Sequence, residues 1–472
     1  MTSKEKDRLF RCLANVSCLV LFTVRVGLAE PFKVLHNFTG VEGGHPQQSL
    51  LLSGNMLYGT AWSGGSGTGV IYAIGTNGTG YTNVYAFSAT SGGSDTFGDS
   101  YGTNGDGAQP LALLLSGDTL YGTTDSGGAQ ASGTLFKVST NGSHFTVLHT
   151  FTNGVDGYGG PDLVMAGGML YGLCVLQQPN GVEDSIFVYA ADTNGNGFTQ
   201  IGPTWTDSYW GALALCGDTL YVAANNEDGQ PYYPATIYSF KTNGTDLKTV
   251  LALDPFANGS DISAPFTVAN KLLYGTAAFG GTGGGGTAYA LDGAGTNFQL
   301  LHAFAPGNGD TNSDGAFPMG PLALSGNVLY GAARGGGGSF DEGTIYSVGT
   351  NSESYKTLHI FSSPFSNPTF SNCGGGYPWS QVVVADGELY GTYFYGGPSG
   401  YGTVFALNVS TNPIPLNLQL QGNGVVLTWV SAAFTLQSAP GASGTFTNVP
   451  NAFSPYTNSL TGSQMFFRLV AN

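Results

Sequence analysis

Short apolar segments, each bounded by Gly, Asn, Asp or Ser, follow one another along almost the whole chain. The most regular is a Leu-Tyr pair, usually continued as Gly-Thr, whose tyrosines are Tyr58, Tyr121, Tyr171, Tyr221, Tyr274, Tyr330 and Tyr390. A self-similar unit of roughly 40–50 residues or slightly more is typical of a propeller or a solenoid. Helices are not expected, because no window of about ten residues keeps a 3.6-residue apolar period free of Gly.

Each repeat contains four short segments that have the composition of strands. In the second repeat they are residues 111–115, 120–123, 133–136 and 148–151. A Ser-Gly-Asp turn joins the first two and a Thr-Asn-Gly turn joins the last two, and these residues tolerate the positive φ of tight hairpins. Four antiparallel strands per unit predict one blade of a propeller.

The two ends of the repeat region complement each other. The seventh repeat stops after its third segment, residues 402–407, and a lone fourth segment, residues 32–38, precedes the first complete repeat. We therefore predict an all-β, seven-bladed β-propeller over residues 30–410, with four strands per blade. The N-terminal strand would complete the last blade and leave no open edge. An open solenoid, the alternative, would need no such matching ends.

The repeat pattern ends after residue 410. Pro413 and Pro415 mark a linker, and the apolar segments that follow have a different spacing. We expect a small C-terminal β-sandwich-like module over residues 411–472, near the lower size limit for a core that is stable by itself. Its expected role is that of an accessory or anchoring module.

The first 29 residues have the composition of an export signal. A basic start with four Lys/Arg precedes an apolar run, and Gly27-Leu28-Ala29 provides a small-x-small cleavage site. The run is shorter than the ~20 residues that a membrane span needs. We expect a signal peptide at residues 1–29 and no membrane span in the mature chain. The protein is then expected to be secreted or at the cell surface, as a monomer.

Composition and charge narrow the class of partner. The chain has 472 residues, 76 of them Gly, with 9% charged and 41% apolar residues, which fits a turn-rich folded protein rather than a disordered one. Without residues 1–29 it keeps 8 basic and 27 acidic side chains, a net charge of −19. Such an acidic surface argues against nucleic acid as a partner. Cys174 and Cys216 are expected to be buried free thiols rather than a disulfide.

The combination of Leu-Tyr-Gly-Thr, a Gly-rich loop, Gly-Thr-x-Phe/Tyr, Thr-Asn-Gly and Leu-His-x-Phe resembles the Gloeo-Verruco (GloVer) repeat family of exported bacterial proteins. The resemblance covers residues 32–410, and the tail is similar to a module of secreted proteins of the Verrucomicrobia. It implies export, tandem repeats and varied anchoring modules, and it transfers no catalytic residues. The third and fourth repeats depart most, with Leu173 in place of Thr and Val222-Ala223 in place of Gly-Thr.

Four histidines occupy one repeated position in the fourth segment: His36, His149, His302 and His359. On different blades they would lie far apart, which does not suit one metal ion. We expect each to make the same structural hydrogen bond.

A calcium loop is the candidate metal site, and Ca²⁺ is the only cofactor that the sequence suggests. The pattern Asp-x-Asn-x-Asp-Gly offers oxygen ligands at Asp310, Asn312 and Asp314, and its Gly permits a sharp turn. A complete EF-hand loop would also have Glu at position twelve, where this chain has Pro321. A Ca²⁺ loop and a plain acidic turn both stay open.

In a propeller, the connections from fourth to first strands and from second to third strands leave one face, and here they are the longest. The aromatic residues of these connections are Trp205, Trp210, Tyr232, Tyr233 and Trp379. Exposed aromatics among acids and amides suit the stacking of sugars, so these five are candidate ligand-binding residues. The alternative is that they fold back onto their own loops.

These observations favour a secreted, noncatalytic propeller that binds an extracellular glycan or a surface protein on its long-loop face. No catalytic residue is assigned. One alternative is a propeller-type glycoside hydrolase or polysaccharide lyase that uses carboxylates such as Asp106, Asp156 and Asp314. A second alternative is a structural repeat protein of the cell surface.

Overall fold

The described residues of this computed structural model form strands, turns and loops and no helix. In the repeat region they are residues 32–91, 102–176, 184–206, 208, 211–225, 234–306, 312–337, 343–361, 378 and 381–409. In the tail they are residues 417–421, 424–428, 434–439, 446–450, 452, 454–459 and 466–471. The expected signal peptide, residues 1–29, lies outside the described residues.

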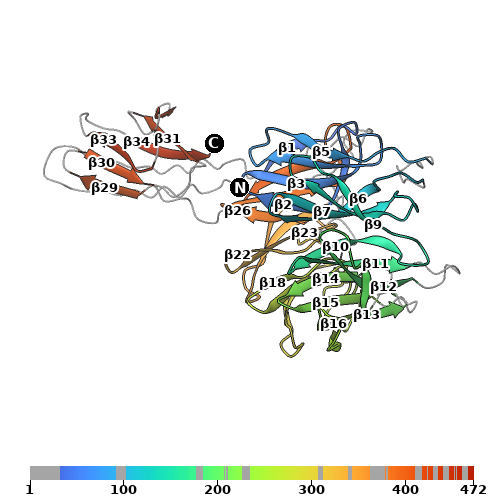
Figure 1. The fold of residues 1–472 in the computed structure, drawn as a ribbon. Coiled ribbons are helices and arrows are strands. Elements are labelled where there is room, and N and C mark those ends of the chain that lie inside the picture. The colour runs from blue at the N-terminus through green and yellow to red at the C-terminus, as the bar shows by residue number, and fades with distance from the viewer. Residues whose placement is uncertain are drawn as a thin grey trace. The chain divides into compact units, whose positions relative to one another are not determined.

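Seven four-stranded sheets follow one another around the repeat region (Figure 1). Blade 1 consists of β2 (Gly44–Ser53), β3 (Met56–Ser63), β4 (Val70–Gly75) and β5 (Thr82–Ala86). Blade 2 consists of β6 (Ala108–Ser116), β7 (Thr119–Ser126), β8 (Thr134–Ser139) and β9 (Thr146–Thr150). Blade 3 consists of β10 (Tyr158–Ala166), β11 (Met169–Leu176), β12 (Ser185–Asp192) and β13 (Thr199–Thr206). Blade 4 consists of β14 (Gly211–Cys216), β15 (Thr219–Asn225), β16 (Ala235–Lys241) and β17 (Lys248–Ala252).

The remaining three blades have shorter first strands. Blade 5 consists of β18 (Thr267–Ala269), β19 (Leu272–Ala277), β20 (Thr287–Asp292) and β21 (Gln299–Ala303). Blade 6 consists of β22 (Ala323–Ser325), β23 (Val328–Ala333), β24 (Thr344–Gly349) and β25 (Lys356–Ile360). Blade 7 consists of β26 (Val383–Ala385), β27 (Glu388–Tyr393), β28 (Thr403–Asn408) and β1 (Phe32–Asn37).

The ring is closed by the two ends of the repeat region. In blade 7 the strand order is β26-β27-β28-β1, so the first strand of the chain lies beside the last strand of the ring. Just beyond β1, the backbone N–H of Phe38 donates to the carbonyl oxygen of Gly402 at 3.0 Å. The first strands of blades 7 and 1, β26 and β2, are also in contact. The predicted seven-bladed propeller, completed by its N-terminal strand, is confirmed.

The glycine of the Leu-Tyr-Gly-Thr segment is required by a facing aromatic ring. Gly59 in β3 pairs with Tyr72 in β4, and a Cβ on Gly59 would lie 2.4 Å from the buried ring. Equivalent pairs are Gly122–Phe136, Gly172–Tyr189, Gly275–Tyr289 and Gly331–Tyr346. The close approach leaves no space for a side chain. In blade 4, which departs from the pattern, Val222 faces a Tyr238 that is only half-buried.

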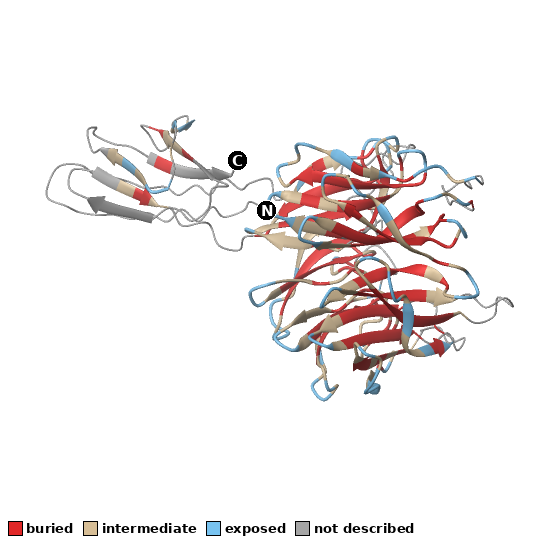
Figure 2. Ribbon diagram, in the orientation of Figure 1, coloured by how far each residue is buried: buried red, intermediate tan, exposed pale blue. Residues whose placement is uncertain are grey.

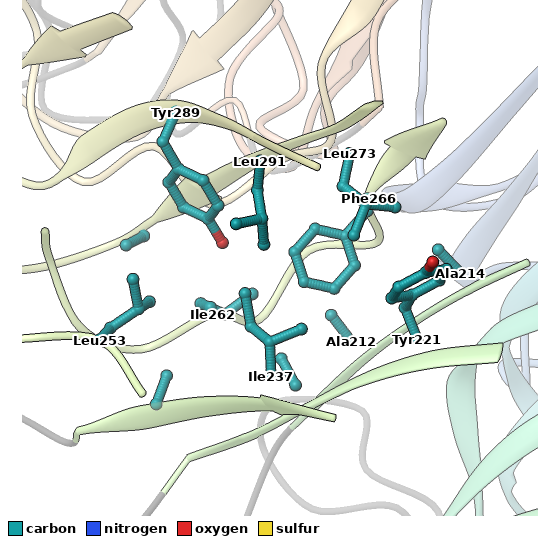
Figure 3. Packing of buried hydrophobic residues seen from close by; sticks show 13 residues of the cluster. Ala212, Ala214, Tyr221, Ile237, Leu253, Ile262, Phe266, Leu273, Tyr289 and Leu291 are labelled. Atoms are coloured by element: carbon teal, nitrogen blue, oxygen red, sulfur yellow. The ribbon is translucent and has the colours of Figure 1, made fainter. Parts of the chain in front are cut away.

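The hydrophobic core lies between neighbouring blades, along the strands that Figure 2 shows as buried. Between blades 4 and 5, Ile237 from one sheet packs with Phe266, Leu273 and Tyr289 from the other (Figure 3). Threonine hydroxyls of the repeat add hydrogen bonds to carbonyl oxygens of the next blade, in the pairs Thr60–Leu111 (3.3 Å), Thr123–Gly160 (2.7 Å) and Thr276–Gly320 (3.2 Å). Each sheet is therefore stabilised mainly by its two neighbours.

The tail forms two three-stranded sheets in a compact unit that is distinct from the bulk of the propeller. One sheet consists of β29 (Asn417–Gln421), β30 (Gly424–Thr428) and β33 (Tyr456–Ser459). The other consists of β31 (Phe434–Ala439), β32 (Thr447–Asn448) and β34 (Phe466–Ala471). This is the small β module that the sequence predicts.

Cys174 and Cys216 are free thiols, as expected, although Cys216 is only half-buried. Burial raises the pKa of the Cys174 thiol well above its usual range, so it is unreactive near neutral pH. Within the part of the chain that the structure describes, no helix is long and apolar enough to cross a membrane.

Candidate ligand-binding site

In three blades, the segment at or just before the first strand is tied to the preceding blade on the long-loop face, where the fourth-to-first and second-to-third connections lie. A backbone N–H at this point donates to a carbonyl oxygen of the preceding blade, in the pairs His45–Tyr401 (2.8 Å), Gln109–Thr68 (2.7 Å) and Phe317–Gly285 (2.8 Å). The three donors have φ between 55° and 59°. Such values persist in non-glycine residues where the surroundings hold them. The same turn thus places a different side chain at each of these three boundaries.

A histidine–carboxylate pair closes three of the described blade boundaries. At the boundary between blades 7 and 1, His36 Nε2 lies 3.4 Å from Glu42 Oε1, and the His36 ring stacks on Tyr81 with the ring centroids 4.0 Å apart. In the other two pairs the distances are those of hydrogen bonds.

His149 Nε2 lies 2.7 Å from Asp156, and the His149 ring stacks on Phe198 of the next blade with the ring centroids 3.6 Å apart. The third copy consists of His302, Asp314 and Tyr355, with corresponding distances of 3.0 and 3.6 Å. The structural hydrogen bond expected for the histidines is confirmed at His149 and His302.

The three carboxylates considered for acid–base chemistry each make hydrogen bonds at a boundary between neighbouring blades. Asp106 accepts the Tyr85 hydroxyl and the Ser88 backbone N–H, both at 2.9 Å. Asp156 and Asp314 are bound to histidines, as described above. The three serve the boundaries between blades 1 and 2, 2 and 3, and 5 and 6. This arrangement gives no support to a shared acid–base centre.

The candidate Ca²⁺ loop is partly described. Asp310 lies outside the described residues. Asn312 Oδ1 accepts the backbone N–H groups of Asp314 and Gly315, at 2.9 and 3.2 Å, and the Asp314 carboxylate binds His302. No group of three or more His, Cys, Asp or Glu within the described ranges could hold a metal ion. The Ca²⁺ site stays a prediction, and the described oxygen atoms are engaged in the turn itself.

The structure describes one of the five candidate aromatic residues. Trp205 is 9% exposed and packs against Tyr238 and Phe240 of blade 4. It lies within β13, which extends to Thr206 and carries the side chain into the core between blades. Trp205 therefore offers little surface to a ligand. Trp210, Tyr232, Tyr233 and Trp379 lie outside the described residues, and their role stays a prediction.

Another group of aromatic residues is exposed where the last blade meets the first. The ring of His45, at the start of β2, has its centroid 5.0, 5.4 and 5.4 Å from those of Phe394, Tyr395 and Tyr401. These three lie in the connection between β27 and β28. Tyr395 is 46% exposed and Tyr401 39%. We call these four residues the seam patch.

Glycines hold the seam patch in a fixed arrangement. A Cβ on Gly40 would lie 2.7–2.9 Å from three atoms of the Tyr401 ring, and one on Gly44 would lie 3.0 Å from that ring. His45 Nδ1 lies 3.2 Å from Ser63 Oγ. Burial lowers the pKa of His45, so its imidazole is neutral near pH 7. Rings that are fixed before a ligand arrives lose little freedom on binding.

Sequence reasoning missed the seam patch because its members come from opposite ends of the repeat region. One signal was present. The residue before the Gly of the third segment is Thr68, Ser132 or Gly285 in other blades, and Tyr401 in the last. The sixth repeat has Glu342 there, so Tyr401 is the one aromatic residue among the repeats that keep this Gly, and it marks a local departure from the scaffold.

Two buried carboxyl groups have strongly raised pKa values. Burial raises the pKa of Asp162, in β10, to about 7, although its Oδ2 accepts the backbone N–H of Leu213 at 2.7 Å. Its Oδ1 is buried without a hydrogen-bond partner among the described residues. Burial also raises the pKa of Asp261 to about 6, and Asn225 donates to it at 3.2 Å. Groups that titrate near neutrality occur at catalytic sites and also in structural networks.

Sequence comparison gives a family match. A family model described as the Gloeobacter/Verrucomicrobia repeat matches residues 20–221 and again residues 211–424. Together the two matches span all seven blades. No curated protein matches the chain in sequence.

Several solved structures are similar to the chain at low sequence identity. An oligogalacturonate lyase from Vibrio parahaemolyticus is 10% identical, with 80% of this chain and 94% of that chain covered and a TM-score of 0.47. A puromycin-hydrolyzing peptidase of Mycobacterium tuberculosis is 11% identical, with 91% and 67% covered and a TM-score of 0.50. The β-propeller domain of the Trilobed protease from Pyrococcus furiosus is 9% identical, with 79% and 95% covered and a TM-score of 0.46. At these identities the likeness concerns the fold alone.

Proposed function

The chain belongs to the Gloeobacter/Verrucomicrobia repeat family, and we propose that it is a secreted or cell-surface, noncatalytic propeller that binds an extracellular polysaccharide at the seam patch. The observation that carries the proposal is the pair of exposed rings, Tyr395 and Tyr401, beside a neutral His45. The apolar C–H face of a sugar ring packs on aromatic rings, while sugar hydroxyls bond to nearby polar groups.

The size of the seam patch favours a sugar over a surface protein. A stable protein interface buries about 800 Å² on each partner, around a packed apolar centre. The seam patch has four side chains, and its two most exposed members have polar hydroxyls. Such a surface suits a chain of sugar residues, each of which needs only a ring and a few hydrogen bonds.

Export is part of the proposal. It is supported by the basic start, the apolar run and the small-x-small site within residues 1–29. The tail module, residues 411–472, is proposed to be an accessory or anchoring module, because it forms a compact unit with its own two sheets.

A polysaccharide array probed with the full mature chain tests the proposal. We expect binding that Tyr401→Ala weakens roughly tenfold, or about 1.4 kcal/mol, because a stacking surface is lost. The matched control is Phe256→Ala, since Phe256 is 70% exposed on the same face but lies between blades 4 and 5. Equal losses in both variants, or no binding to any polysaccharide, would contradict the proposal.

Turnover is measured in the same samples, because a glycoside hydrolase or a polysaccharide lyase is the alternative function. Acid–base chemistry on a sugar needs a carboxyl group that reaches the substrate, and Asp162 is 3% exposed, so its raised pKa does not make it a catalytic residue. Release of reducing ends would favour the enzyme over the binding protein. Absence of both binding and turnover would favour a structural role at the cell surface.

A further inference from the structure

The two faces of the propeller differ in charge. The described acidic residues of the long-loop face are Glu42, Asp106, Asp125, Asp156, Asp184, Asp254, Asp261 and Asp314. The only Lys or Arg that the structure describes on that face is Arg334. The opposite face, where the short turns lie, also carries acidic residues but balances them with Lys33, Lys137, Lys241, Lys248, Lys271 and Lys356. A negative potential therefore extends over the long-loop face.

Most carboxylates of the long-loop face are committed to the loops that carry them. Glu42, which lies between Gly40 and Gly44, accepts the backbone N–H of Thr39 at 3.0 Å. Asp254 accepts the backbone N–H of Phe256 at 2.8 Å. The carboxylates at the blade boundaries, Asp106, Asp156 and Asp314, bind Tyr85, His149 and His302. These groups act on a ligand through their field rather than by direct contact.

The seam patch itself offers no charged partner. It presents the rings of Phe394, Tyr395 and Tyr401, two phenolic hydroxyls, the Ser63 hydroxyl and the imidazole of His45. An anionic polymer would approach against the surrounding negative field without finding a cation in the patch. A cationic polymer would find no carboxylate in the patch to bind.

We propose that the seam patch selects an uncharged polysaccharide and excludes polyuronates. The inference rests on the proposed function and names its ligand class. A polyuronate carries one carboxylate per sugar, within a Debye length of about 8 Å of the next at physiological salt. Its repulsion by the long-loop face accumulates along the chain, whereas an uncharged polymer keeps the ring contacts without that repulsion.

A matched pair of polymers tests the selection. The neutral polysaccharide that binds best in the array is compared with its own derivative, in which part of the C6 hydroxymethyl groups are oxidised to carboxylates. Affinities are measured at low salt and at 0.5 M NaCl, with EDTA present. We expect at least a tenfold weaker affinity for the oxidised polymer at low salt, and recovery of most of that loss at high salt, because salt screens the repulsion.

The outcomes separate the ligand class from the binding function. Tightest binding to a polyuronate, with or without Ca²⁺, or to the cationic polymer chitosan, would overturn the ligand class while preserving polysaccharide binding. A loss on oxidation that salt leaves unchanged would also overturn it, because the cause would be steric. No binding to any polymer would overturn the proposed function itself.

Glu42→Gln isolates the electrostatic contribution. Gln keeps a side-chain oxygen that can accept the Thr39 N–H but removes the charge nearest in sequence to the glycines under Tyr401, a charge that also faces His36 Nε2 at 3.4 Å. Urea unfolding of the variant shows whether loss of the His36 contact has changed the stability of the boundary. We expect an unchanged affinity for the neutral polymer. The ratio of the affinity for the neutral polymer to that for the oxidised polymer should be at least twofold smaller than in the wild type. Asp292→Asn, on the opposite face, should leave that ratio unchanged, and an equal effect of both variants would contradict a field that acts locally.

Discussion

The boundary between blades 5 and 6 and the boundary between blades 7 and 1 are built from the same parts. In each, a third-strand glycine packs against a proline of the next blade, in the pairs Gly286–Pro318 and Gly402–Pro46. In each, a residue with positive φ donates its N–H to the residue before that glycine. The two boundaries differ in the residue whose carbonyl oxygen accepts this N–H. It is Gly285 at the first boundary and Tyr401 at the second.

This difference distinguishes the residues that maintain the fold from those proposed to bind a ligand. The contacts shared by the two boundaries recur around the ring, so they serve the fold. The exposed rings of Tyr395 and Tyr401 occur at one boundary, so a role in binding a ligand is proposed for them and not for the shared contacts. Variants in shared contacts should then change stability, and variants in the rings should change binding.

The largest loss of stability is expected from Gly331→Ala. Its Cβ would lie 2.4 and 2.5 Å from Oη and Cζ of the buried Tyr346 and 2.8 Å from a Leu322 methyl group. The free energy of unfolding should fall by about 3 kcal/mol, since an overpacked core cannot relax. Gly105→Ala, where nothing lies within 4 Å of the added Cβ, should change it by less than about 0.5 kcal/mol. Urea unfolding of both variants measures this, and equal effects would contradict the proposed role of the facing ring.

Asp162→Asn should stabilise the protein in a pH-dependent way. The pKa of Asp162 is raised from 3.8 to about 7, so wild-type stability falls as pH rises from about 4 to 7, when the buried carboxyl group must ionise. The variant lacks this loss and should be more stable at pH 8 by roughly 4 kcal/mol, since each pKa unit corresponds to about 1.4 kcal/mol, with little difference at pH 4. Urea midpoints at the two pH values give the result, and a gain that is the same at both would contradict the assignment.

Asp314→Asn should weaken the boundary between blades 5 and 6. It replaces the carboxylate that binds His302 Nε2 and the Ala305 N–H with a neutral amide. A loss of about 1 kcal/mol is expected, because a charge-assisted hydrogen bond becomes an ordinary one. Affinity for the polysaccharide should be unchanged, since this boundary lacks the exposed rings. A large loss of affinity with normal stability would show that the boundary between blades 5 and 6 also contributes to binding, which would contradict the assignment of binding to the seam patch.

The smallest effect is expected from Tyr346→Phe. The Tyr346 hydroxyl is buried without a hydrogen-bond partner among the described residues, and Phe136 and Phe405 fill the same position in blades 2 and 7. The free energy of unfolding should stay constant or rise by less than about 1 kcal/mol. Chemical unfolding checks this, and a clear loss would indicate that the hydroxyl has a partner such as a buried water.

The fold could be predicted from the sequence because its determinants are local and repeated. The turn glycines and the Leu-Tyr pair recur in each repeat, and the incomplete segments at the two ends of the repeat region match each other in sequence. Trp205 could not be placed, because only the extension of β13 to Thr206 turns an apparent loop residue into a core residue. The seam patch was equally hidden, since His45 and Tyr401 meet only when the ring closes.

A structure of the protein with an oligosaccharide of the best-binding neutral polymer tests the central claim most directly. We expect a sugar ring in van der Waals contact with Tyr395 or Tyr401, at the boundary between blades 7 and 1. An ordered sugar bound elsewhere on the propeller or on the tail module, with the seam patch empty, would contradict it.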